Sequence, residues 1–141
     1  MDLLTKLYQD EGNRPCVYQD SLGYWTIGVG ICVDQRVPGA GLTPDEVMFL
    51  LQSRINRARA QLTEQLPWIS ALDEPRASVL IEMAFQLGDH GLLQFHNALT
   101  AAQSGDFETA ATQLLASKWA TQTPERAKRL AEQLRTGQWS T

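Results

Sequence analysis

Two carboxylates and one hydroxyl lie close together in the N-terminal part of the chain, at Glu11, Asp20 and Thr26. A carboxylic acid that keeps its proton can protonate a leaving group, and a second, ionised carboxylate can activate a water molecule. A hydroxyl beside that second carboxylate could hold the water in place. The three residues therefore form a possible general acid, general base and water site, which is the arrangement of an inverting glycosidase.

Glu11 is predicted to be the last residue of a helix over residues 2–11. Leucines and a tyrosine at positions 3, 4, 7 and 8 have helical spacing, and Gly12 is a natural helix end. Glu11 extends this apolar face, and it stands at the negative end of the helix dipole. Partial burial and the helix end both favour a protonated carboxyl group. The position equally suits a solvated surface glutamate, so this alternative stays open.

Asp20 and Thr26 belong to a segment, residues 14–33, that predicts short antiparallel strands joined by tight turns. If residue 20 pairs with residue 24, and 18 with 26, the side chains of Asp20 and Thr26 project from the same face of the hairpin. The plain alternatives are an aspartate that caps a turn and a threonine that only builds a strand.

The elements that must position these residues predict an α+β fold. Thr43-Pro44-Asp45-Glu46 is a strong helix start, and an apolar stripe then follows at Val47, Leu51, Ile55, Ala58 and Leu62. Further helices are predicted from Asp73 to about Gly88, at 96–104, at 107–117 and from Pro124 to Gly137. We expect a single domain over 1–141, made of a small β lobe (about 12–42), a linking helix (about 43–65) and a helical lobe (about 66–141) that includes the N-terminal helix 2–11.

Composition narrows the classes of function. The net charge of −4 argues against a nucleic-acid binder. Charged residues in the first twelve positions argue against a signal peptide or a membrane-inserted segment. Cys16 and Cys32 are expected to be free thiols, and the two histidines, His90 and His96, match no metal-ligand pattern. We therefore expect no metal and no cofactor.

The stretch that contains Glu11, Asp20 and Thr26 reads E-G-x-R-x-x-x-Y-x-D-S-x-G-Y-W-T-I-G-V-G. It resembles the catalytic segment of the T-even phage lysozymes and lambdoid endolysins, glycoside hydrolase family 24. The resemblance continues at Phe85-Gln86-Leu87-Gly88 and Phe95-His96-Asn97. It is strongest from Ser117-Lys118-Trp119 through Gln122-Thr123-Pro124-Glu125-Arg126 to Arg135-Thr136-Gly137-Gln138-Trp139. These separate matches, which follow the same order, cover nearly the whole chain.

The resemblance implies a lysozyme-like fold and a muramidase that cleaves the β-1,4 bond between N-acetylmuramic acid and N-acetylglucosamine with inversion. Glu11 would protonate the leaving oxygen, Asp20 would activate or orient the water, and Thr26 would help to hold it. Four positions correspond to the saccharide cleft of the family, namely Cys32, Phe85, Gln86 and Gln113, although cysteine and glutamine at the first and last of these are departures. Arg126 matches an arginine near the catalytic glutamate. For Trp119, a place in the core is the preferred interpretation.

The chain also departs from the family where a histidine after G-x-G often pairs with an aspartate on the linking helix. The corresponding residues are Ile31 and Arg54, so that ion pair is absent. Two other functions stay open, a lytic transglycosylase and a catalytically silent peptidoglycan-binding domain. The expected setting is a monomer in the host cytoplasm that reaches periplasmic glycan strands through a holin-type pore and lyses the host cell. A virion-borne or injected module is the alternative.

Overall fold

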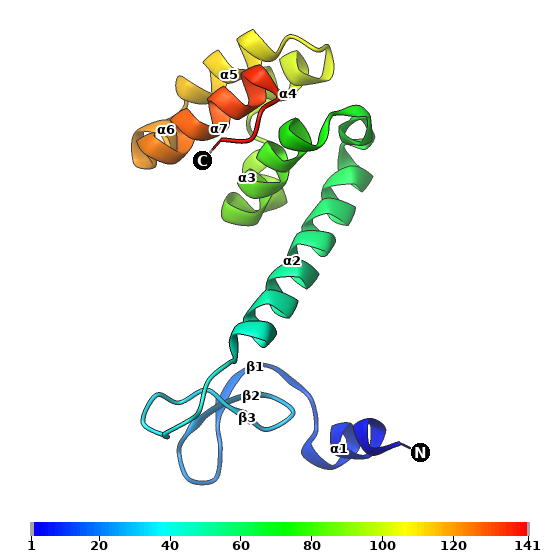
Figure 1. Ribbon diagram of the computed structural model, residues 1–141, viewed down its shortest axis with the longest axis vertical. Helices are drawn as coiled ribbons and strands as arrows, with labels where there is room; N and C mark the ends of the chain where they lie inside the picture. Colours follow the sequence, from blue (N-terminus) through cyan, green and yellow to red (C-terminus); the bar gives the residue numbers. More distant parts are fainter. Residues whose placement is uncertain (1, 141) are drawn as a thin grey trace. The chain divides into compact units, whose positions relative to one another are not determined.

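The computed structural model describes residues 2–140, which form two compact units (Figure 1). The first unit ends at Leu51 and the second begins at Gln52. The boundary lies within a long helix, α2, which spans Pro44–Gln65. The expectation of a single domain whose helical lobe includes the N-terminal helix stays a prediction.

The first unit contains a short helix and a small antiparallel sheet. Helix α1 spans Leu3–Glu11, and the sheet has the order β1-β2-β3, with β1 at Arg14–Gln19, β2 at Trp25–Gly28 and β3 at Ile31–Cys32. Asp2 caps α1 by accepting a hydrogen bond from the Thr5 amide at 2.7 Å. The register of β1 and β2 shifts between Arg14 and Tyr18, so the pairing of these strands is irregular there. The predicted combination of a small sheet with helices, the α+β class, is confirmed.

Helix α2 begins at the residues that predicted its start. The Thr43 amide donates to the Glu46 carboxylate at 2.7 Å, and the Glu46 amide donates back to Oγ1 of Thr43 at 3.3 Å. This is a capping box, which satisfies two amides that have no partner inside a helix. Towards the other end of α2, Leu62 is fully buried and Ile55 and Ala58 pack against the same core.

The second unit is helical. After the 3-10 helix at Pro67–Ala71 come α3 (Glu74–Leu92), α4 (His96–Gln103), α5 (Phe107–Leu115), α6 (Lys118–Gln122) and α7 (Pro124–Thr136). Helices α5 and α7 lie side by side (Figure 1). The expected helices are confirmed to within a few residues at their ends. Helix α6 was not predicted, because its five residues are too few to show a periodic pattern.

Helix α3 contributes much of the buried core of the second unit. Buried residues on α3 include Val79, Leu80, Ile81 and Met83, as expected for a helix with a narrow polar stripe. Asp73 caps the helix as predicted, by accepting from the Arg76 amide at 3.0 Å. Gly88 has φ +74°, so the regular helix breaks there as expected, and a further helical turn then carries the chain to Leu92. This break lies directly after Phe85, Gln86 and Leu87.

Candidate active site

Glu11 is placed by α1 against the turn that joins β2 to β3. Its Oε2 atom lies 3.0 Å from the position that a Cβ would take on Gly30. This contact is possible because Gly30 has no side chain, and its φ of +78° also favours glycine. Within the first unit Glu11 is exposed and α1 has no buried residue, so the expected partial burial of Glu11 stays a prediction. The local helix therefore positions this carboxyl group without shielding it from water.

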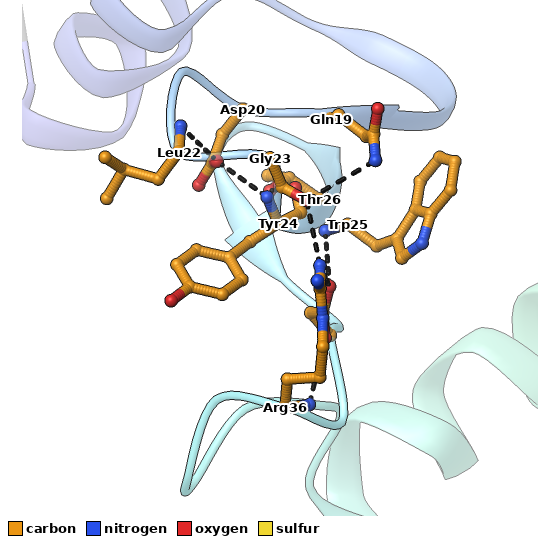
Figure 2. Close-up of polar contacts among 9 residues, drawn as sticks. Gln19, Asp20, Leu22, Gly23, Tyr24, Trp25, Thr26 and Arg36 are labelled. Carbon is orange, nitrogen blue, oxygen red and sulfur yellow. Dashed lines mark hydrogen bonds and ion pairs between the residues drawn. The ribbon is translucent and has the colours of Figure 1, made fainter.

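Asp20 begins the turn between β1 and β2, and its carboxylate is held by backbone amides of the following residues (Figure 2). Its Oδ1 atom accepts hydrogen bonds from the amides of Leu22 and Tyr24, both at 2.9 Å. The main chain also closes the hairpin, because the Asp20 amide donates to the Tyr24 carbonyl at 2.9 Å. Within the described part of the chain, the Oδ2 atom makes no hydrogen bond, which leaves it free to accept one from water.

Thr26 lies two residues beyond this turn, in β2. The predicted register is confirmed, since Tyr18 pairs with Thr26 and Asp20 bonds to Tyr24. Asp20 and Thr26 therefore share one face of the hairpin. Thr26 is only 3% exposed, and its hydroxyl donates to the Tyr24 carbonyl at 3.1 Å. The hydroxyl proton is thus engaged, and the oxygen can still accept a hydrogen bond.

Cys32 is the only other predicted site residue in the first unit. It lies on β3 directly opposite Thr26, so the sheet brings these two side chains together. Its thiol is free, as is that of Cys16, which agrees with the expectation for both cysteines. Glu11, Asp20, Thr26 and Cys32 are all carried by, or in contact with, one three-stranded sheet and its turns.

The remaining predicted residues lie in the second unit. Phe85 is half exposed on α3, and the neighbouring Gln86 accepts a hydrogen bond from the indole of Trp119 at 3.2 Å. Trp119 is buried, as preferred from the sequence, and packs edge to face against Phe95. Gln113 lines a pocket of about 400 Å³ that both of these aromatic residues also line. Gln86, Trp119, Phe95 and Gln113 therefore belong to one neighbourhood of the helical unit, and Phe85 lies directly before Gln86 on α3.

Arg126 is on α7, where its nearest acidic partner in the second unit is Glu82. The Nε atom of Arg126 lies 3.8 Å from the Glu82 carboxylate, and both side chains are about half exposed. Such a long, solvated ion pair is weak. The place of Arg126 near the catalytic glutamate, which the resemblance implied, stays a prediction.

Asp34 and Arg36 are two residues of the first unit that the sequence did not single out. The carboxylate of Asp34 is buried, at 3% exposure for the residue, and it accepts from the Trp25 amide at 3.0 Å. Arg36 donates to it from Nε at 2.9 Å and from Nη2 at 2.6 Å. The available signal was an aspartate directly after an apolar strand, two residues before an arginine. That signal is weak, because a loop with these residues is usually solvated.

Asp34 should make the stability of the first unit depend on acid. The hydrogen bond from the Arg36 side chain, followed by the bond from the Trp25 amide, holds the pKa of the Asp34 carboxyl well below its usual range. Because the folded pKa is lower than the unfolded one, the ionised carboxylate stabilises the fold above the unfolded pKa, and this contribution disappears as the pH falls. We expect the loss to begin below about pH 5 and to continue through the folded pKa.

The measurement is thermal unfolding at several pH values between pH 7 and pH 3. Unfolding is monitored in NMR spectra through the indole N–H signal of Trp25. The Asp34→Asn variant should be less stable at pH 7 and should lose less stability on acidification. Equal slopes for the wild type and the variant would contradict the assignment of the acid dependence to Asp34.

Two further observations concern metal binding and membrane-spanning helices. Residues 2–140 contain no group of three or more His, Cys, Asp or Glu side chains that could hold a metal ion. Over the same range, none of the helices combines the length and the apolar character needed to cross a membrane.

The structure combines three features. A glutamate ends the first helix, an aspartate and a threonine share one hairpin face, and a separate unit is helical. This combination is that of a lysozyme-like domain of the glycoside hydrolase class. Comparison with known families agrees with this class. Residues 8–135 match the family model described as phage lysozyme. The chain belongs to the phage lysozyme family.

Three similar proteins show the range of settings in which such a domain occurs. The pre-baseplate central spike protein Gp5 of Enterobacteria phage T4 is 30% identical over 97% of this chain and 28% of its own length. Probable T4-type lysozyme 1 of Dictyostelium discoideum is 26% identical over 93% of this chain and 92% of its own length. Peptidoglycan hydrolase gp36 of Pseudomonas phage phiKMV is 30% identical over 87% of this chain and 14% of its own length. The chain thus spans less than a third of the two phage proteins.

Proposed function

We propose that this domain is a muramidase, which hydrolyses the β-1,4 bond between N-acetylmuramic acid and N-acetylglucosamine in peptidoglycan with inversion. The observation that carries the proposal is the family match over residues 8–135, which includes Glu11, Asp20 and Thr26. The name of gp36 describes a peptidoglycan hydrolase, which supports peptidoglycan as the substrate class.

The proposed reaction uses the first unit for its proton transfers. Glu11 donates its proton to the leaving oxygen of the glycosidic bond. Asp20, held by two backbone amides through Oδ1, uses Oδ2 to accept a proton from the attacking water. Thr26 accepts a hydrogen bond from the same water through its hydroxyl oxygen. Water then adds to the sugar carbon on the face opposite the departing sugar, and the configuration at that carbon inverts.

Substrate binding is assigned to Cys32 on the sheet and to four residues of the second unit. Phe85 is half exposed and offers an apolar surface to a sugar ring, whereas Gln86 and Gln113 offer amide groups to hydroxyl and acetamido groups. Arg126 offers a positively charged guanidinium group. No cofactor is required in this scheme, because both proton transfers use side chains of the chain itself.

Analysis of the reaction products tests the proposal. Purified peptidoglycan digested with the protein should yield new reducing ends, and NMR spectra recorded early in the digestion should show the α anomer first. Ends in the 1,6-anhydro form would instead identify a lytic transglycosylase. Binding to peptidoglycan without any cleavage would identify a catalytically silent wall-binding domain. Either of these two results would overturn the proposal.

The biological role proposed for this activity is lysis of the host cell. We infer that the domain acts as a monomer on glycan strands of the periplasm and leaves the host cytoplasm through a holin-type pore. The route stays a prediction. The name of Gp5, a spike protein, places a related domain in a phage particle, which supports a virion-borne module as the alternative.

A further inference from the structure

The turn that carries Asp20 is held from outside the β1–β2 hairpin. Its residues Asp20-Ser21-Leu22-Gly23 have little packing of their own, since Leu22 is 78% exposed and Gly23 has φ +80°. Gly23 donates to the Asp20 carbonyl at 3.0 Å, which closes the turn on itself but does not anchor it to the rest of the unit. Within the hairpin, the Gln19 side chain donates to the Gly23 carbonyl at a long 3.4 Å. A shorter hydrogen bond to the same carbonyl comes from another segment.

That segment is the loop after β3, which supplies Asp34 and Arg36. The Nη2 atom of Arg36 donates to the Gly23 carbonyl at 2.9 Å, and the guanidinium group lies 5.3 Å from the centre of the Tyr24 ring (Figure 2). Asp34 accepts the Trp25 amide at 3.0 Å. Three consecutive residues, Gly23 to Trp25, are thus each contacted by this pair, and they connect the Asp20 turn to Thr26.

The pair is itself fixed in orientation. Asp34 accepts from the backbone amide of Arg36 at 2.9 Å as well as from its Nε and Nη2 atoms. A guanidinium group in a forked contact with a carboxylate has a defined plane, and its remaining N–H groups point in defined directions. A buried carboxylate with this many donors is stable only while they are in place, because an isolated buried charge is costly. The position of the Gly23 carbonyl is therefore coupled to an ordered ion pair.

We propose that Asp34 and Arg36 are positioning residues for catalysis, which hold the hairpin turn so that Asp20 and Thr26 stay aligned on one water molecule. The link to Asp20 passes through Tyr24, whose amide donates to Oδ1 of Asp20. Tyr24 lies between Gly23 and Trp25, the two residues that the pair holds by hydrogen bonds. The link to Thr26 is the Tyr24 carbonyl, which accepts the threonine hydroxyl. This inference rests on the proposed function.

Kinetics on soluble, uncross-linked glycan strands test the proposal with Arg36→Lys, Arg36→Gln and Asp34→Asn. A displacement of about 1 Å can reduce a rate by about 100-fold. We expect kcat to fall about 10-fold or more for Arg36→Gln and Asp34→Asn, with KM nearly unchanged, because four of the five proposed substrate-binding residues lie in the second unit. Arg36→Lys keeps the charge but loses the fork, so its kcat should lie between those of the wild type and Arg36→Gln.

A second readout does not depend on activity. The amide signals of Leu22 and Tyr24, which bond to Asp20, should shift in NMR spectra of every variant, and least in Arg36→Lys. The matched control is Asp73→Asn in the second unit, where the carboxylate also accepts a backbone amide and pairs with the Arg76 guanidinium at 2.7 Å. This control should lower the melting temperature and leave kcat and both amide signals unchanged.

The outcomes separate this inference from the proposed function. An inactive wild-type protein would count against the muramidase assignment, whereas the amide signals would still show whether the pair orients Asp20. An active wild type with an unchanged kcat in folded Arg36→Lys and Arg36→Gln would overturn the positioning role. So would unchanged Leu22 and Tyr24 signals in those variants. A fall in kcat that the Asp73→Asn control matches would show a general loss of stability instead, and would equally overturn it.

Discussion

Replacing Glu11 by glutamine is expected to reduce peptidoglycan hydrolysis by a factor on the order of 10² to 10⁴. Glutamine keeps the size of the side chain and its contact with Gly30, but it has no acidic proton to give to the leaving oxygen. The folded structure should tolerate the change, because Glu11 is exposed within its unit and ends its helix. The measurement is the rate of reducing-end release from purified peptidoglycan, with a thermal melt of the same sample.

Glu64→Gln is the matched control for this variant. Glu64 is also an exposed glutamate close to the C-terminal end of a helix, in this case α2. It should keep the full rate, and both variants should melt within a few degrees of the wild type. Activity in Glu11→Gln equal to that of Glu64→Gln would show that Glu11 is not the proton donor.

Replacing Leu114 by alanine is expected to cost about 2 to 5 kcal/mol of the free energy of unfolding of the second unit. Leu114 is 1% exposed on α5, within the core that α5 shares with α7. Alanine removes apolar contacts there and leaves a cavity that the surrounding helices fill only in part. For a unit of this size, the loss corresponds to a fall in melting temperature on the order of 10 °C or more.

The neighbouring residue gives the control for packing. Leu115 lies on the same helix and is 47% exposed, so Leu115→Ala makes the same chemical change at a site that water already reaches. Its cost should be below about 1 kcal/mol. Urea unfolding followed by the fluorescence of the tryptophans, including the buried Trp119, measures both variants. Similar midpoints for the two would mean that α5 is not packed as the structure shows.

The sequence predicts the fold well where local signals and burial agree. Thr43 and Glu46 form the capping box that their spacing indicates, and Gly88 breaks α3 at the expected position. The pairing of Tyr18 with Thr26 follows from the length of the turn and from side-chain alternation. Each of these features depends on residues that are near one another along the chain or on a regular period.

The site is less predictable where distant segments meet. The bond from Arg36 to the Gly23 carbonyl joins residues thirteen positions apart, and neither residue type indicates its partner. Burial of Glu11 was expected from the spacing of Leu7 and Tyr8, but α1 buries no residue within its unit. A helical period identifies which side chains share a face, and it does not show what covers that face.

The contact between Glu11 and Gly30 has a consequence for protein engineering. Substituting larger residues for glycines in turns is a common way to stiffen a protein, because glycine adds entropy to the unfolded chain. At Gly30 even one methyl group would meet a carboxyl oxygen at 3.0 Å. Attempts to raise the thermal stability of this hairpin should therefore keep glycine at position 30, because the Glu11 carboxyl group occupies the space that a side chain would need.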